Sequence, residues 1–195
     1  MQGYTLEVED RFDGPDLDTS LWLPHHLPHW SSWTASAARY RLGDGLLRLV
    51  VEEDQPPWCP EFDGQVRVSS LQTGDTAGQH RFAASDVGRE HSAVGMGVHP
   101  FGDPTITDEF AAVPLPIDAT EFHEYAAEWT PERIRFLVDD EQVKQVEQSS
   151  DYPMQFMFGV YAFPDAEGGP PPGPYPKEFV VDRFRGYRRP ASSAG

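Results

Sequence analysis

The chain has 195 residues, of which 38% are hydrophobic and 24% are charged, a length and balance that predict one globular domain with a buried core. Its 32 acidic and 15 basic residues give a formal net charge of −17. Such a surface repels nucleic-acid phosphates and anionic membranes, so we expect neither as a partner.

The single cysteine and the composition of the N-terminus indicate which covalent links, metal sites and cellular compartment to expect. Cys59 is the only cysteine, so the sequence predicts no internal disulfide and no cysteine-based metal site. The start, MQGYTLEVED, lacks the basic and apolar regions of a secretory signal, and no apolar run is long enough for a transmembrane helix. As written, the chain is expected in the cytoplasm; a leader removed from its start would make it a secreted protein.

Short alternating runs bounded by turn residues recur along the chain, and long helical periodicity is absent. The 17 glycines and 19 prolines also argue against long helices. Residues 40–42 and 46–51 flank Gly43-Asp44-Gly45, the pattern of a β-hairpin with a tight turn. Residues 65–71 then alternate polar and apolar side chains, as a half-buried strand does.

The clearest pattern lies between Phe122 and Val146. Three short runs with strand character, separated by turn residues, follow one another at 122–129, 134–138 and 142–146. Short loops between alternating runs predict a three-stranded antiparallel meander.

The C-terminal part continues the all-β pattern. Residues 154–161 are apolar on both faces, as in a central strand, and residues 178–187 form a further predicted strand. The proline-rich segment 168–174 between them is expected to be a loop, because proline cannot donate to a ladder. Many short strands predict a sandwich of two packed sheets, formed as a single domain by residues 1–188, with a frayed tail at 189–195.

Three segments resemble glycoside hydrolase family 16. Residues 12–22, FDGPDLDTSLW, resemble the opening of those domains; residues 122–139 resemble the strands that follow the catalytic strand; residues 176–184 are similar to the final strand. The resemblance implies a concanavalin-like jelly roll of two antiparallel sheets whose concave sheet forms a glycan cleft. It also implies retaining hydrolysis or transfer of β-linked glucans or galactans.

The catalytic pattern that the resemblance implies is missing. Retaining glycosidases use two carboxyl groups about 5–5.5 Å apart, and the family carries them on one strand as E-x-D-x-E or E-x-D-x-x-E. Neither spacing occurs in this sequence. The nearest approach is Glu61-Phe62-Asp63, with Gln65 or Val66 where the third carboxylate is required. We therefore predict no catalytic residues.

The position at which the family carries its catalytic strand indicates a deletion in this chain. In the family it precedes a strand resembling residues 93–99, and further cleft strands come before it. Between Phe82 and Ala93 there is too little chain for several strands of about five or six residues each. The sequence therefore predicts a junction over a deletion, natural or artefactual. Asp86 and Glu90 at this junction are expected to be solvated.

A second candidate region is rich in aromatic rings and imidazoles. Residues 23–33 contain three histidines and two tryptophans, and sugar rings stack on indoles while imidazoles bond their hydroxyls. We predict that Trp30, Trp33, Trp58 and His29 contact substrate, a β-linked polysaccharide or oligosaccharide. The alternative is that these rings pack in the core or at its rim; a metal site is disfavoured because prolines interrupt the histidines.

The resemblance also implies a structural calcium ion, although no cofactor is required for the reaction. Residue by residue, the matches are Glu9 and Gly45, through backbone oxygens, and Asp182, through its carboxylate. Such hard oxygen ligands suit Ca²⁺. The alternative for Asp182 is an ion pair with a neighbouring arginine.

Three functions remain open. The chain is a family 16-like β-glycan hydrolase of weak or absent activity, a non-catalytic, lectin-like glycan-binding β-sandwich, or an unstable fragment. The sugar and its linkage are not indicated by the sequence.

Overall fold

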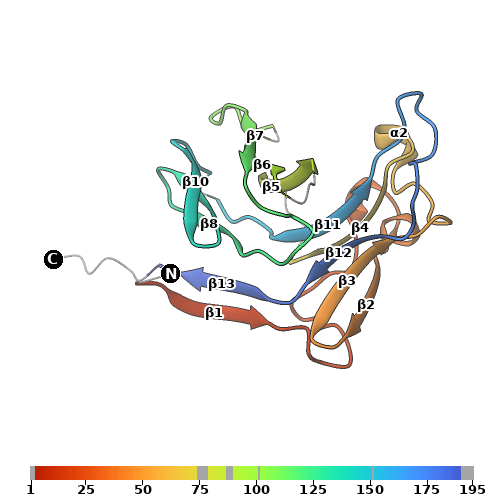
Figure 1. Cartoon of the computed structure of the whole chain (residues 1–195), viewed down its shortest axis with the longest axis horizontal. Coiled ribbons are helices and arrows are strands. Elements are labelled where there is room, and N and C mark those ends of the chain that lie inside the picture. Colours follow the sequence, from red (N-terminus) through yellow and green to blue (C-terminus); the bar gives the residue numbers. More distant parts are fainter. Residues whose placement is uncertain (1–2, 74–78, 87–89, 101, 151, 190–195) are drawn as a thin grey trace. The chain divides into compact units, whose positions relative to one another are not determined.

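A computed structural model describes residues 3–73, 79–86, 90–100, 102–150 and 152–189, of which 79–86 are described by their backbone. The chain divides into two compact units: unit 1 comprises Met1–Asp75 and Phe156–Gly195, and unit 2 comprises Thr76–Gln155. Within each unit every strand pairing is antiparallel, as predicted (Figure 1). The prediction of a single domain stays a prediction.

Unit 1 contains three small sheets and three short helices. β3 lies between β2 and β12, β11 lies beside β4, and β1 pairs with β13 (Figure 1). The strands are β1 (Thr5–Asp10), β2 (Arg39–Gly43), β3 (Leu46–Val51), β4 (Arg67–Gln72), β11 (Met157–Ala162), β12 (Lys177–Val181) and β13 (Phe184–Arg188), and the helices are η1 (Pro28–Trp30), α1 (Trp33–Ser36) and α2 (Pro60–Asp63). Among the described residues, no helix is long and apolar enough to cross a membrane.

The predicted hairpin is confirmed at β2 and β3. Both residues of its turn have positive φ, 56° at Asp44 and 69° at Gly45. A two-residue turn of this kind matches the twist of the paired strands, and aspartate and glycine tolerate it best.

The prediction of one strand over residues 178–187 is wrong. The segment breaks at Asp182–Arg183 into β12 and β13, which have different partners. β12 ends with Val181 opposite Leu47 of β3, and β13 begins with Phe184 opposite Asp10 of β1. Apolar residues stand on both sides of the break, Phe179–Val181 before it and Phe184 and Tyr187 after it, and the change of partner strand depends on contacts far apart in the sequence.

The N-terminal motif FDGPDLDTSLW builds the core of unit 1. Phe12 and Trp22 are 3% and 1% exposed and pack in one cluster with Leu47, Leu49 and Leu71. The Asp10 carboxylate accepts the indole N–H of Trp22 at 2.7 Å and the backbone N–H of Phe12 at 2.8 Å. The second bond holds Phe12 at φ 52°, a left-handed conformation that is uncommon for a bulky residue.

Unit 2 contains two three-stranded sheets, ordered β5-β6-β7 and β10-β9-β8. The second is the predicted meander, which is therefore confirmed. Val94, Met96 and Val98 of β6 pack with Ile134 and Phe136 in a buried core. The strands are β5 (Gln79–Asp86), β6 (Ser92–His99), β7 (Glu109–Leu115), β8 (Tyr125–Trp129), β9 (Ile134–Val138) and β10 (Glu141–Val146).

The predicted junction at residues 83–92 begins as a regular strand. β5 pairs with β6 from Gln79 opposite His99 to Asp86 opposite Ala93, with one irregularity after Ala84. Residues 87–89 lie outside the described residues. Small residues hid this strand from pattern analysis, because Ala83, Ala84 and Ser85 show no polar–apolar alternation. The predicted deletion itself stays a prediction.

Replacing Asp10 tests the support of the unit 1 core. Asp10→Ala leaves the buried indole N–H without its acceptor, so we expect the free energy of unfolding in urea to fall by about 2–3 kcal/mol. Asp13→Ala, which removes an exposed carboxylate nearby, is the control and should change it by less than about 0.5 kcal/mol. Equal effects of the two substitutions would contradict the role given to Asp10.

An imidazole–carboxylate pair makes unit 2 pH-sensitive. His123 Nδ1 lies 2.7 Å from Asp139 Oδ2, and Nε2 lies 3.0 Å from the backbone oxygen of Asp118. The Asp139 carboxylate raises the pKa of His123 above its ordinary value, against the opposing effect of burial. The stabilisation is therefore complete below the ordinary pKa and disappears as the pH rises through the raised one.

We expect the wild-type protein to have a higher free energy of unfolding than His123→Gln, and this difference to be larger at acidic than at alkaline pH. From about pH 9 to about pH 5.5 the difference should grow by up to about 1 kcal/mol, since Asp139 is half exposed. Denaturant titrations at both pH values measure it. An unchanged difference between the two proteins would show that the pair does not couple protonation to folding.

Candidate functional site

Seven rings of unit 1, three of them on the short helices η1, α1 and α2, make three sets of ring contacts: His25 with Trp33, Trp30 with Phe62, and His26 with both Trp58 and Tyr161. We call them the aromatic cluster: His25, His26, Trp30, Trp33, Trp58, Phe62 and Tyr161. Their contacts are edge-to-face, with centroid separations from 4.1 Å for His25–Trp33 to 5.6 Å for Trp30–Phe62. Edge-to-face packing is a favoured geometry of aromatic pairs. Rings of the sequence region singled out above therefore pack against one another in these three sets, while their contact with substrate stays a prediction.

His26 is the buried centre of this cluster. It is 4% exposed, and its ring stands edge-on to Trp58 at 4.5 Å and to Tyr161 at 5.4 Å. Its Nδ1 lies 3.0 Å from the hydroxyl oxygen of the fully buried Ser70. Burial lowers the pKa of His26 to about 4, because the charged imidazolium is poorly solvated there. His26 is thus neutral at neutral pH and serves as packing.

Trp58 lies beneath the surface. It is 5% exposed and packs with Cys59, Val66 and Val68. Its indole N–H donates to Asp63 Oδ2 at 2.8 Å. Trp58 therefore packs in the core, which is the alternative that the sequence left open for it. Other side chains form the exposed part of the cluster.

The exposed rings include three predicted residues and two that pattern analysis missed. Trp30 and Trp33 are 38% and 61% exposed, and His29 is also exposed, with its ring centroid 5.9 Å from that of Trp30. Phe62 and Phe163 are 66% and 60% exposed. Phe163 stacks on Tyr161 with an interplanar angle of 13°. Phe163 directly follows β11 and stands two residues after Tyr161, so the spacing of these two aromatic residues was the available signal.

The nearest approach to the catalytic pattern lies on a helix. Glu61 and Asp63 belong to α2, a four-residue helix, and Asp63 accepts the indole N–H of Trp58. They are therefore not neighbours on one face of a strand, and one of them already has a structural role.

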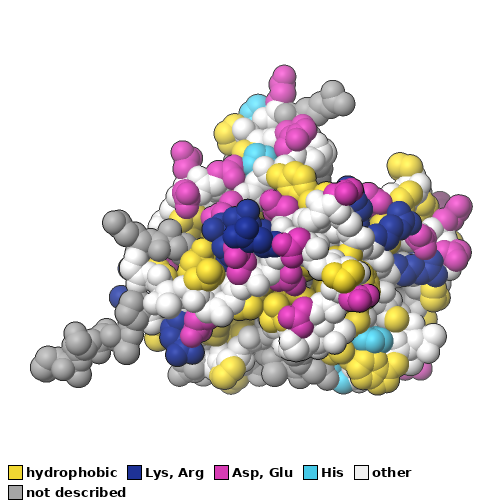
Figure 2. Space-filling model, turned by 90° about the horizontal axis from the view of Figure 1, so that it is seen from below, with side chains coloured by type: hydrophobic (Ala, Val, Ile, Leu, Met, Phe, Trp, Pro, Cys, Tyr) yellow, Lys and Arg dark blue, Asp and Glu magenta, His cyan; other side chains and the backbone are white. Residues whose placement is uncertain are grey.

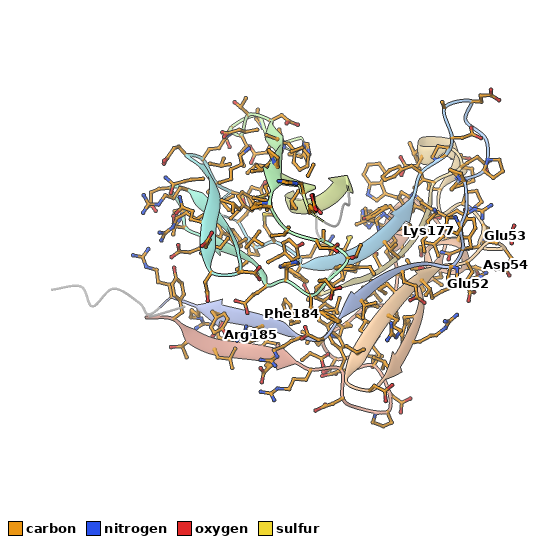
Figure 3. All side chains as sticks on the ribbon, viewed as in Figure 1. Glu52, Glu53, Asp54, Lys177, Phe184 and Arg185 are labelled. Carbon is orange, nitrogen blue, oxygen red and sulfur yellow. The ribbon has the colours of Figure 1, made fainter. Side chains whose placement is uncertain are left out.

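A second Glu-x-Asp pair, Glu52 and Asp54, escaped the sequence analysis. Figure 3 shows it at the end of β3, near Lys177 at the start of β12. Arg39 Nη1 lies 2.7 Å from Glu52 Oε2 and also contacts Asp54. Pro56 stands where a third carboxylate would be needed, so this pair is an ion-paired surface group.

Several further carboxylates of unit 2 have protein partners. Asp103 accepts from the backbone and hydroxyl of Thr105, Asp108 lies 2.6 Å from His99 Nδ1, and Glu128 pairs with Arg135. Asp86 side-chain atoms lie outside the described part. Within that part, no three His, Cys, Asp or Glu side chains come together in a group that could hold a metal ion.

The predicted calcium ligands all lie in unit 1. The Glu9 carboxylate pairs with Arg11 at 3.1 Å, which leaves the Glu9 backbone oxygen as the group implied by the resemblance. Gly45 sits in the β2–β3 turn, and an added Cβ would lie 4.0 Å from the backbone oxygen of Arg11. Asp182 is exposed between β12 and β13. A structural Ca²⁺ at these residues stays a prediction.

The buried imidazole should make unit 1 sensitive to acid. His26 must lose its neutral state when the chain unfolds below its ordinary pKa, so stability falls as the pH drops toward about 4. We expect wild type to lose about 3 kcal/mol more than His26→Gln between about pH 7 and about pH 4 in urea titrations. Parallel pH profiles for the two proteins would contradict a buried, neutral His26.

Comparison with known proteins shows a family similarity over part of the chain. Residues 86–166 match the model of glycosyl hydrolases family 16. A β-glucanase from Rhodothermus marinus is 34% identical over an alignment of 98 residues that covers 42% of this chain and 34% of that protein. The chain thus spans about a third of the length of the curated relative that it matches.

Solved structures confirm the predicted jelly roll. A GlcNAcα1-4Gal-releasing endo-β-galactosidase from Clostridium perfringens has a TM-score of 0.79 at 24% identity, over 97% of this chain and 64% of that one. The laminarinase from Rhodothermus marinus has a TM-score of 0.62 at 20% identity, over 95% of this chain and 97% of that one. Over residues 86–166 the chain is thus similar to glycoside hydrolase family 16, and over nearly its whole length it shares the fold of these structures.

Proposed function

We propose that this protein binds β-linked polysaccharide through the aromatic cluster of unit 1 and hydrolyses it weakly or not at all. The observation that carries the proposal is the coexistence of exposed, mutually packed rings with a sequence that lacks both spacings of the catalytic triplet. The relatives support the ligand class, since they include a β-glucanase and a laminarinase.

The exposed rings suit a sugar in physical terms. Pyranose rings present flat C–H faces that pack against indole and phenyl rings, and nearby polar groups fix their orientation. Trp33 has more than half of its surface free for such contact, while its edge-to-face contact with His25 holds the indole in place. Ser32 caps α1 by accepting the backbone N–H of Ala35 at 3.1 Å, which fixes the turn that presents Trp33.

We expect low turnover because the reaction needs two free carboxyl groups, and three candidate carboxylates of unit 1 already have other partners. Retention requires a nucleophile and a separate acid/base, and a single carboxylate cannot fill both roles in one cycle. Asp63 is bonded to Trp58, and Glu52 and Asp54 are bonded to Arg39. The shortened segment between Phe82 and Ala93 is the proposed reason for the missing pair.

Binding and turnover can be measured on the same protein. We expect laminarin or lichenan to retard the protein in native gels, while release of reducing ends stays near the protein-free rate. Trp33→Ala should weaken retardation about ten-fold or more, since stacking rings dominate such contacts. Phe122→Ala is the matched control, because Phe122 is a similarly exposed ring, 58% accessible, in unit 2, and it should leave retardation unchanged.

Two results would count against the proposal. Sustained release of reducing ends by the wild-type protein would show a working carboxylate pair and identify an active hydrolase. Equal loss of retardation in Trp33→Ala and Phe122→Ala would show that the aromatic cluster is not the binding site.

A further inference from the structure

The segments that supply the aromatic cluster contain almost no charge. Residues 21–38 have no Lys, Arg, Asp or Glu, and neither do residues 156–164. Residues 55–66 contribute only Glu61 and Asp63. This is unusual in a chain of which 24% is charged, and it leaves the cluster without a single ammonium or guanidinium of its own.

The nearest basic residues along the chain are occupied elsewhere. Arg39 pairs with Glu52 and Asp54. Arg67 donates to the backbone oxygen of Glu53 at 2.6 Å and lies over the Tyr175 ring. Arg39 is thus held by two carboxylates, and Arg67 is engaged through one Nη atom, while its Nε is buried.

The two imidazoles of the aromatic cluster, His25 and His26, do not supply positive charge at neutral pH. Burial lowers the pKa of His25 and brings the pKa of His26 to about 4. Both rings are therefore neutral hydrogen-bonding and packing groups.

Negative charge, in contrast, is present at the cluster. Glu61 is exposed next to Phe62 on α2, and it adds to the negative field of a chain with net charge −17. Figure 2 shows acidic side chains spread widely over one face of the molecule.

From these observations we infer that the aromatic cluster selects uncharged glycans and rejects glycans that carry carboxylate or sulfate groups. Recognition of such anions relies on guanidinium or ammonium partners with charge-assisted bonds, which the cluster lacks, and the surrounding acidic field adds repulsion. The inference rests on the proposed function, because it specifies the substrate class of the same site.

The test compares one β-glucan in two charge states. Binding of laminarin and of carboxymethyl-laminarin is measured by affinity electrophoresis at neutral pH, in low and in high salt. We expect the anionic form to bind about ten-fold more weakly at low salt, with the gap narrowing at high salt as repulsion is screened. Equal or tighter binding of the carboxymethyl form would overturn the inference. Failure of both forms to bind would instead remove the proposed function.

A charge reversal at the cluster provides the second arm. Glu61→Lys should raise affinity for carboxymethyl-laminarin several-fold and leave laminarin binding unchanged. Asp16→Lys makes the same charge change at an exposed position in the loop after β1, outside the cluster, and should have a smaller effect. If the two variants raise affinity equally, the selectivity belongs to the net charge of the whole chain and the local inference is wrong.

Discussion

A buried indole needs an acceptor for its N–H group, and this requirement shapes unit 1 of the structure. Trp22 donates to Asp10 at 2.7 Å, and Trp58 donates to Asp63 at 2.8 Å. The two indoles belong to different hydrophobic clusters, so each carboxylate supports a different part of the core. An unmet donor in a core costs about 1–3 kcal/mol, so these two bonds decide whether the large rings can be buried.

The hydrogen bond between Trp58 and Asp63 also matters for the proposed function. Trp58 and Tyr161 enclose His26, and the exposed rings Trp30 and Phe62 pack against each other at the surface of the same assembly. A firm aromatic surface is suited to sugars. Carboxylates that stabilise indoles or pair with Arg39 are not placed as nucleophile and acid. The proposed function thus joins an exposed aromatic surface to a sequence that lacks both spacings of the catalytic triplet.

Much of the fold could be predicted from the sequence, because local turn chemistry and alternation specify it. The hairpin at Asp44-Gly45 and the meander from β8 to β10 are of this kind. Three features could not be predicted. The break between β12 and β13 depends on a change of partner strand, β5 is built from small residues, and the burial of Trp58 depends on long-range contacts with Val66 and Tyr161. Substrate contact at the predicted rings stays a prediction; the structure adds that Trp58 is buried while Trp30, Trp33 and His29 are exposed.

The most direct test of the central claim is a crystal structure of the protein with a bound laminari-oligosaccharide. The account predicts an intact sugar chain stacked on the exposed rings around Trp30 and Trp33, with no two carboxyl groups flanking any glycosidic oxygen. It would be contradicted by two carboxyl groups about 5–5.5 Å apart on either side of a glycosidic bond, or by a sugar covalently attached to an aspartate or glutamate.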